Sequence, residues 1–155
     1  MNYLTVASPL GELTIFADVF DGGGAIVALE FGCAPEPAGS PGVLLRRVAR
    51  QLTDYFAGRR KVFDLPLRPA GTPFQRRVWA ALSAIPYGAT LTYGALARKL
   101  RSAPRAVGGA CGANPIPIMI PCHRVLGADR RLGGYSGEGG PTTKRHLLAL
   151  EGVFP

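Results

Sequence analysis

The chain has 155 residues, of which 47% are hydrophobic, and a formal net charge of +8 at neutral pH. This length suits one compact domain or two small lobes, and this apolar content argues against a disordered chain. Three cysteines form no CxxC pair, no basic leader precedes an apolar core, and prolines interrupt the long apolar runs. We therefore expect a cytoplasmic protein with reduced thiols, no signal peptide and no membrane-spanning helix.

The first 70 residues predict a small α/β lobe that serves as a scaffold. Alternating apolar and polar residues predict strands at 3–8, 12–18 and 25–31. Residues 61–67 fit either a fourth strand or an extended connector. The lobe has no histidine, and Cys33 has no second ligand near it in sequence, so we expect no metal site here.

A helix is expected after the third strand. Ser40 and Pro41 are typical of an N-cap followed by the first helical turn, and Gly58 is expected to end the helix. Its buried face is expected to consist of apolar residues at helical spacing: Val43, Leu44, Val48, Leu52, Tyr55 and Phe56.

Residues 71–155 predict a mostly helical lobe. Thr72, Pro73 and Gln75 have the pattern of a capping box with proline in the first turn. The core face of the helix that follows is expected to be formed by Phe74, Val78, Trp79, Leu82 and Ile85. A last helix is expected to begin at Pro141, after a glycine-rich loop, and to end at Gly152.

Two short helices with a tight turn are expected in the middle of this lobe. Thr92 would cap a helix to about residue 100, and a second helix would run from 104 to 112 after a turn at 101–103. This is a helix-turn-helix pattern. Gly108 and Gly109 would each cost about 1 kcal/mol against alanine in the second helix, so we expect them to allow close approach to another backbone.

Positive charge is concentrated in the second lobe. Residues 1–70 have seven basic and seven acidic side chains, whereas residues 71–155 have eleven basic and three acidic ones. No acidic residue occurs between Asp64 and Asp129. The basic residues in that interval are Arg68, Arg76, Arg77, Arg98, Lys99, Arg101, Arg105 and Arg124. A stretch of one sign this long favours a polyanion over an ordinary solvated surface, and with the helix-turn-helix it favours DNA.

The segment 114–125, with the sequence NPIPIMIPCHRV, places a cysteine after an apolar run interrupted by prolines. Proline disfavours helix, so we expect a stiff, extended segment that fixes the position of Cys122. Such a cysteine is either a packing residue or a nucleophile; His123 and Arg124 favour the nucleophile, because cationic neighbours favour thiolate. On an extended segment Cys122 and His123 would point to opposite faces, so we expect a bridging water rather than a direct bond.

The motif Pro121-Cys-His-Arg-Val125, preceded by Arg105-Ala-Val-Gly-Gly-Ala110 and Asn114-Pro115, resembles the O6-alkylguanine-DNA alkyltransferase family. The resemblance is close over residues 74–152 and loose before them. It implies an α/β, ribonuclease-H-like N-terminal lobe, residues 1–70, and a mostly α C-terminal lobe with the helix-turn-helix, residues 71–155. The first lobe would be the scaffold, and the second would bind DNA and accept the alkyl group.

The resemblance also implies an activity, that of a methylated-DNA–[protein]-cysteine S-methyltransferase. Such a protein carries out direct-reversal DNA repair: it flips an O6-alkylguanine out of double-stranded DNA and transfers the alkyl group irreversibly to its own cysteine, once per molecule. O4-alkylthymine remains open as a second substrate. No cofactor, metal or membrane partner is implied; we expect a monomer, with cooperative assembly on DNA left open.

The roles of individual residues follow from the same resemblance. Cys122 resembles the alkyl acceptor, His123 its base acting through a water, and Glu151 the carboxylate that orients the histidine. Tyr93 resembles the residue that displaces the base and donates to it, and Asn114 the asparagine beside the cysteine. The implied substrate pocket consists of Pro117, Val125, Gly133, Tyr135 and Ser136. The implied DNA-binding residues are Thr92, Arg101, Ser102, Arg105, Ala106 and Arg124. Of these, Arg105 resembles the finger that fills the vacated base stack.

The sequence departs from the family pattern at two places. Two extra residues occur near 138–140, and Cys111 stands where the family varies, where we expect a small pocket-side or groove-side residue. A lesion sensor that flips alkylguanine without transfer would lack the acceptor cysteine, so Cys122 argues against it. An unrelated Cys-His hydrolase is disfavoured by the helix-turn-helix and the scarcity of acidic residues.

Overall fold

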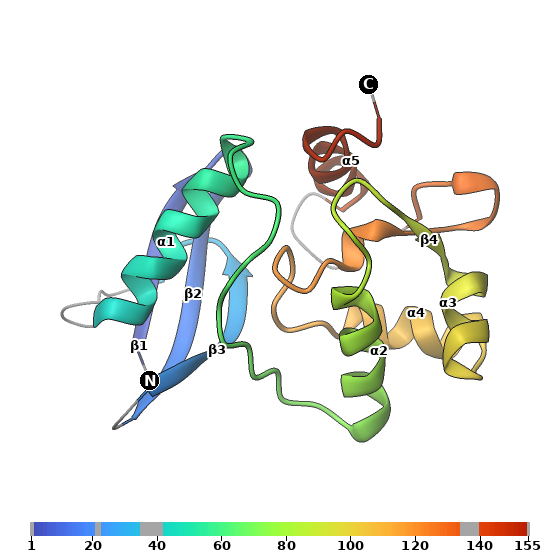
Figure 1. Ribbon diagram of the computed structural model, residues 1–155, viewed down its shortest axis with the longest axis horizontal. Coiled ribbons are helices and arrows are strands. Elements are labelled where there is room, and N and C mark those ends of the chain that lie inside the picture. Colours follow the sequence, from blue (N-terminus) through green and yellow to red (C-terminus); the bar gives the residue numbers. More distant parts are fainter. Residues whose placement is uncertain (1, 21–22, 35–41, 134–139, 155) are drawn as a thin grey trace. The chain divides into compact units, whose positions relative to one another are not determined.

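The computed structural model describes residues 2–20, 23–34, 42–133 and 140–154 (Figure 1). The chain divides into two compact units, Met1–Pro69 and Ala70–Pro155. The predictions made for Ser40, Pro41, Tyr135 and Ser136 lie outside the described residues. In the described ranges, no helix is long and apolar enough to cross a membrane.

The N-terminal unit is an antiparallel sheet with one helix packed on it (Figure 1). Strands β1 (Asn2–Ser8), β2 (Gly11–Phe20) and β3 (Gly23–Phe31) pair in that order, and helix α1 spans Gly42–Phe56. Ile15 lies opposite Leu4 on one side and Leu29 on the other. The core consists of buried side chains from β2, β3 and α1: Leu13, Ile15, Ala17, Ile26, Leu29, Leu45, Val48, Leu52 and Tyr55.

The predicted inner face of α1 is partly wrong. Val43 is 75% exposed, whereas Leu45 is fully buried. Because Leu45, Val48, Leu52 and Tyr55 repeat at helical spacing, they define the buried stripe and leave Val43 on the other side. The helical turn ends as predicted near Gly58, where φ is +78°.

Residues 61–67 form no strand, so the extended connector is the correct alternative. The segment touches the sheet at one bridge, between Ile26 and Leu67. There the Ile26 amide donates to the Pro66 carbonyl oxygen at 2.8 Å, and the Arg68 amide donates to the Ile26 carbonyl oxygen at 2.8 Å. Pro66 has no amide hydrogen, so a ladder cannot continue through it.

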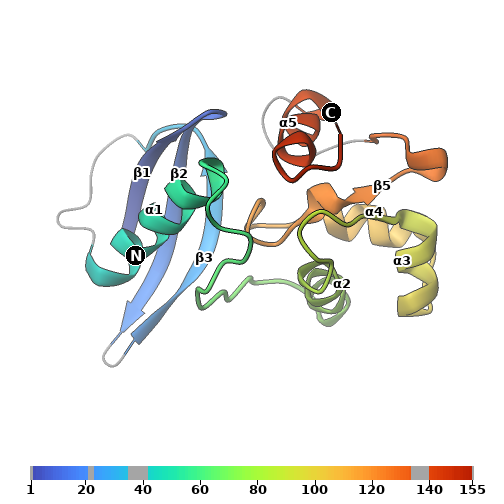
Figure 2. The ribbon, with the colours of Figure 1, turned by 45° about the horizontal axis from the view of Figure 1, so that its top comes forward.

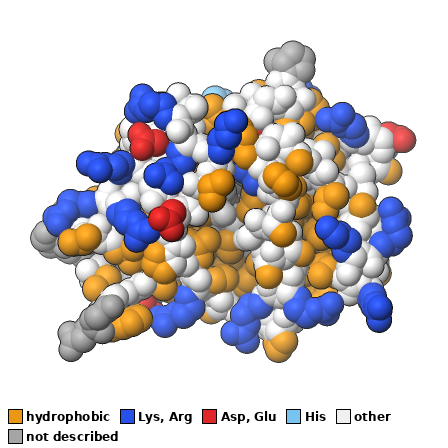
Figure 3. Space-filling view, viewed as in Figure 1, with side chains coloured by type: hydrophobic (Ala, Val, Ile, Leu, Met, Phe, Trp, Pro, Cys, Tyr) orange, Lys and Arg blue, Asp and Glu red, His pale blue; other side chains and the backbone are white. Residues whose placement is uncertain are grey.

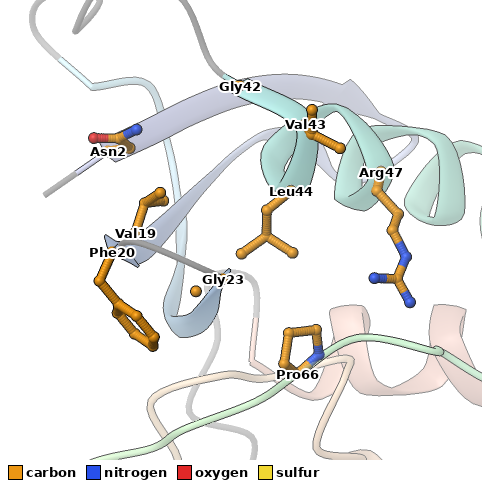
Figure 4. A pocket seen from close by; sticks show the side chains of 10 residues that line it. Asn2, Val19, Phe20, Gly23, Gly42, Val43, Leu44, Arg47 and Pro66 are labelled. Atoms are coloured by element: carbon orange, nitrogen blue, oxygen red, sulfur yellow. The ribbon is translucent and has the colours of Figure 1, made fainter.

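An open pocket of about 450 Å³ lies in this unit, between the β2–β3 end of the sheet and the first turns of α1 (Figure 4). It is lined by Asn2, Val19, Phe20, Gly23, Gly24, Gly42, Val43, Leu44, Arg47 and Pro66. A Cβ atom at Gly24 would lie 2.6 Å from the Asp18 carbonyl oxygen, so only glycine fits there. Arg47 brings a charged side chain to this wall and Asn2 a neutral polar one; the other lining residues are apolar or glycine.

The C-terminal unit is mostly helical. Its helices are α2 (Pro73–Ser83), α3 (Tyr93–Leu100), α4 (Pro104–Gly112) and α5 (Pro141–Leu150). Figure 2 shows the short strand β5 (Val125–Leu126) lying among them; it pairs in parallel with β4 (Leu91–Thr92). Two single 3-10 turns, η1 (Cys122–Arg124) and η2 (Ala128–Arg130), flank β5 in sequence.

The helix boundaries in this unit follow from local signals. The predicted capping box of α2 is confirmed: Thr72 Oγ1 accepts from the Gln75 amide at 3.1 Å, and Gln75 Oε1 accepts from the Thr72 amide at 2.9 Å. The predicted cap of α3 is confirmed as well, since Thr92 Oγ1 accepts from the Ala95 amide at 3.0 Å. Arg101 ends α3 in the left-handed region, with φ of 53°. The predicted fold class, including the two helices and the turn between them, is confirmed.

Two local predictions in this unit are wrong. A Cβ atom added at Gly108 or Gly109 would meet nothing within 4 Å, so neither glycine allows a close approach within the chain. Cys122–Arg124 is a 3-10 turn rather than an extended segment. The Cys122 amide donates to the Ile120 carbonyl oxygen at 2.8 Å and the Arg124 amide to that of Pro121 at 3.0 Å. These bonds wind the chain, so the expectation that adjacent side chains alternate between opposite faces does not apply.

Candidate active site

The chain before Cys122 is a buried turn fixed by the side chain of Asn114. Its Nδ2 donates to the Ile120 carbonyl oxygen at 2.8 Å, and its Oδ1 accepts from the Ile116 amide at 2.9 Å. Within this turn Ile118 has φ of +74°, which is rare for a β-branched residue and costs on the order of 1 kcal/mol. Asn114 therefore fixes the conformation of the turn that leads into Cys122.

The two residues that follow Cys122 make three hydrogen-bond contacts to one carboxylate, that of Glu151. His123 Nε2 lies 2.7 Å from Glu151 Oε2. Arg124 donates from Nε to Oε1 at 2.8 Å and from Nη2 to Oε2 at 3.0 Å, and from Nη1 to the Ile85 carbonyl oxygen at 2.6 Å. The side chains of His123 and Glu151 are fully buried. A surface position for Glu151 is thus excluded, although it follows the C-terminal end of α5.

The tautomer of His123 follows from this contact. Burial lowers the pKa of His123, against the opposing effect of its hydrogen bond to Glu151, so the imidazole is neutral at neutral pH. A carboxylate can only accept, so Nε2 carries the hydrogen and Nδ1 carries a lone pair. Nδ1 is buried and has no hydrogen-bond partner among the described residues. His123 therefore has an unoccupied basic atom.

Cys122 lies in a buried cluster with Tyr93, Cys111 and Lys144. The thiols of Cys111 and Cys122 both interact electrostatically with the Tyr93 hydroxyl and with the Lys144 amine. Burial raises the pKa of Tyr93 to about 12, so its hydroxyl keeps its proton and can donate. Burial likewise raises the pKa of Cys111 to about 12, so this second thiol stays protonated. Cys111 lies on the inner side of α4, which agrees with the pocket-side alternative.

Lys144 is the member of this cluster that the sequence interpretation missed. The residue is fully buried, and its Nζ lies 5.6 Å from the centre of the Tyr93 ring. Burial lowers the pKa of this amine, while the two thiols act in the opposite direction. Position 144 lies three, four and seven residues before the buried Leu147, Leu148 and Glu151, so helical spacing places it on the same inner side.

The residues expected to line the substrate pocket are only partly described. Pro117 and Val125 are buried, and Val125 pairs with Leu91 in the short sheet. Gly133 has φ of +69°, and a Cβ atom there would lie 3.5 Å from Lys144 Nζ and 3.6 Å from Tyr93 Cε2. Gly133 is thus adjacent to the cluster around Cys122, and its positive φ favours glycine at this position.

The residues expected to bind DNA divide into two groups. Arg101, Arg105 and Ala106 are exposed at the end of α3 and the start of α4, and Ser102 is half-buried between them. Lys and Arg side chains dominate the charged surface of this unit (Figure 3). Thr92 is occupied as the cap of α3. Arg124, which was also expected to contact DNA, is instead buried with its guanidinium on Glu151.

No group of three or more His, Cys, Asp or Glu side chains that could hold a metal ion occurs within the described parts of the chain. At Glu151 the guanidinium of Arg124 supplies a positive charge, and the neutral imidazole of His123 supplies a hydrogen bond.

Comparison with known proteins covers both units. Residues 73–153 match the family model of the 6-O-methylguanine DNA methyltransferase DNA binding domain, and residues 1–69 match that of its ribonuclease-like domain. A methylated-DNA–protein-cysteine methyltransferase of Haemophilus influenzae is 42% identical over 162 residues, which cover 99% of this chain and 87% of that protein. One from Mycobacterium tuberculosis is 44% identical over 160 residues, covering 97% and 92%.

A solved structure agrees with these matches. The crystal structure of Mycobacterium tuberculosis OGT in complex with DNA has a TM-score of 0.84 to this chain at 43% identity, covering 97% of this chain and 92% of that one. The family resemblance inferred from the cysteine motif is therefore confirmed over both units. This chain belongs to the 6-O-methylguanine DNA methyltransferase family.

Proposed function

We propose that this protein repairs O6-alkylguanine in double-stranded DNA by transferring the alkyl group to Sγ of Cys122, once per molecule. The single observation that carries the proposal is the neutral, buried His123. Its Nε2 is held by Glu151, and its Nδ1 lone pair is without a partner among the described residues. Next to the cysteine of the family motif, that lone pair is the base that the reaction needs.

The proposed reaction is a displacement at the alkyl carbon. The proton of Cys122 passes to His123 Nδ1, through a water if the two groups are not in direct reach. The sulfur then forms a bond to the alkyl carbon as the bond from that carbon to guanine O6 breaks. Glu151 stabilises the imidazolium that forms, and Arg124 keeps Glu151 ionised and oriented.

Tyr93 acts on the leaving group in this proposal. Negative charge develops on the guanine as the carbon–oxygen bond breaks, and a positioned hydroxyl stabilises it. The raised pKa of Tyr93, about 12, supports the role because the hydroxyl remains a donor at neutral pH. The Lys144 amine, close to the same ring, favours negative charge on the nearby sulfur before attack.

The product is a thioether, which has no good leaving group. Nothing in the proposed chemistry regenerates the thiol, so one protein repairs one lesion. The base must also leave the duplex, at a cost of a few kcal/mol that is lower for a poorly paired lesion. Exposed Arg105 at the start of α4 would offset part of that cost by filling the gap in the stack.

The mass of the intact protein after incubation with duplex DNA containing O6-methylguanine tests this function. We expect a gain of one methyl group, on Cys122, in the wild type. Cys122→Ser should gain nothing while retaining DNA affinity, and the matched variants Cys111→Ser and Cys33→Ser should still be methylated. DNA binding without any methyl gain would identify a lesion sensor instead. Product release beyond one equivalent would identify a turnover enzyme, and either result would refute the proposal.

A further inference from the structure

Charge in the N-terminal unit is separated along the chain, although its total cancels. Residues 1–41 contain five acidic side chains and no basic one. Residues 42–70 contain seven basic and two acidic side chains. Residues 1–41 therefore have all but two of the acidic residues of this unit, and α1 with the segment after it has all of the basic ones.

Two arginines form the outer stripe of α1. Arg46 and Arg50 are exposed and lie one helical turn apart, about 6 Å along the axis. Successive residues of a helix are rotated by about 100°. Arg50 therefore lies opposite the buried stripe formed by Leu45, Val48 and Leu52, and Arg46 lies next to Arg50. Exposed Thr53 continues the same side without charge. The first turn of α1 has no acidic residue.

Both carboxylates in this part of the chain are already occupied. Asp64 pairs with Arg47 at 3.2 Å, and Asp54 pairs with Arg59 at 3.3 Å. The side chain of Gln51 also binds the backbone of Asp64. The Asp64 amide donates to Gln51 Oε1 at 2.9 Å, and Gln51 Nε2 donates to the Asp64 carbonyl oxygen at 3.1 Å. These contacts fix the segment after α1 alongside the helix. Within the described ranges, Arg46 and Arg50 have no ion-pair partner.

We propose that Arg46 and Arg50 form a second contact surface for the phosphate backbone of DNA, separate from the helix-turn-helix; this rests on the proposed function. Phosphates carry the dominant, sequence-independent part of protein–DNA affinity, and arginine is well suited to bind them. Figure 3 shows Lys and Arg side chains gathered around α1 with few Asp or Glu side chains among them. Val43 is the exposed apolar side chain on the same side of α1. A lone valine lacks the aromatic and apolar core typical of a protein interface, so the two arginines fit a phosphate contact better.

A DNA contact of this kind is measurable as salt dependence. We expect Arg46→Gln and Arg50→Gln each to reduce the slope of log affinity against log salt by about 0.9, and the double variant by about twice as much. The probe is an undamaged duplex longer than one binding site, titrated with the full-length protein over about 50 to 200 mM salt. Glutamine is a good helix former, so α1 should persist.

Ala7→Glu is the matched control, because it changes the net charge by the same amount at an exposed position of β1. Its slope should equal that of the wild type. The proposal is overturned if the arginine variants retain the wild-type slope, or if Ala7→Glu reduces the slope as much as they do. It is also overturned if the arginine variants keep the slope and lose only self-association of the protein, measured by sedimentation. Methyl transfer from free O6-methylguanine base should be unchanged in all variants; its absence from the wild type would refute the proposed function rather than this surface.

Discussion

Both carboxylate oxygens of Glu151 accept hydrogen bonds from the guanidinium of Arg124, at 2.8 and 3.0 Å. One of these oxygens also contacts His123. The arginine that follows the Cys-His pair in sequence is therefore structural in the proposed site: it holds the carboxylate that holds the base. Its charge is used inside the protein and contributes nothing to the exposed basic surface.

Arg124→Met should destabilise the protein and stop the reaction. The change leaves the carboxylate of Glu151 buried without its cation, and loss of one partner from a buried ion pair costs about 3–5 kcal/mol. Urea unfolding measures that loss. Arg98→Met, at an exposed position of α3, should change stability by less than about 0.5 kcal/mol.

Arg124→Lys is the informative partner of that variant, since it should fold. Lysine retains the charge but cannot form the two-pronged contact. We expect slower methyl transfer from free O6-methylguanine with an unchanged final stoichiometry of one. A wild-type transfer rate in Arg124→Lys would show that the orientation of Glu151 does not matter.

The stability of the protein should fall as the pH drops below about 6.5. Burial lowers the folded-state pKa of His123, so between the folded and unfolded pKa values the unfolded chain binds the extra proton. The stabilisation is therefore complete above the unfolded pKa and is lost on acidification. Urea unfolding at a series of pH values measures the slope.

The chain offers a matched control for this pH dependence, since it has two histidines. His123→Gln should flatten the slope, whereas His146→Gln, at an exposed position of α5, should leave it unchanged. An equal effect of the two variants would contradict the assignment of the acid sensitivity to His123.

Tyr93→Phe should slow transfer by about a hundredfold, the usual effect of removing one donor to a developing oxyanion. Because the pKa of Tyr93 is about 12, ionisation of its hydroxyl should not limit the wild-type rate below that pH. Single-turnover kinetics on methylated duplex measures the change. Tyr87→Phe, which removes the hydrogen bond from Tyr87 to the Leu150 carbonyl oxygen, should cost about 1 kcal/mol of stability with little change in rate.

Lys144→Met should lower the reactivity of Cys122 on the order of tenfold, because it removes a buried cation from the surroundings of the sulfur. Alkylation of Cys122 by iodoacetamide, followed by mass spectrometry, reports this without DNA. Arg145→Met, one residue further on the exposed side of α5, serves as the comparison. If both variants react alike, Lys144 has no electrostatic role at the thiol.

Much of the fold could be predicted because its signals are local. Thr72 with Gln75, and Thr92 before α3, satisfy helix termini within a few residues, so sequence spacing alone identifies them. The strands of the N-terminal unit likewise follow from alternation. Leu45 was missed because Leu44 and Leu45 both fit a helical repeat of apolar residues. Packing of α1 on the sheet decides which of the two is buried.

The parts that could not be predicted depend on contacts distant in sequence. Arg124 resembled a DNA contact because its partner, Glu151, lies 27 residues away. The conformation around Cys122 depends on bonds from Asn114 to Ile120 and Ile116 that close a turn, and the prolines alone indicated an extended chain. Lys144 was overlooked because a lysine is rarely buried, although its helical position already indicated the inner side.

Trp79 is the only tryptophan of the chain, and its indole nitrogen donates to the Ala110 carbonyl oxygen of α4 at 2.8 Å. The ring is almost fully buried, and its emission depends on that hydrogen bond and on the packing around it. Displacement of α4 would therefore change the intrinsic fluorescence of the whole protein. The molecule thus contains its own optical reporter for α4, the helix that carries Arg105, and a displacement of this helix can be followed in real time without a dye.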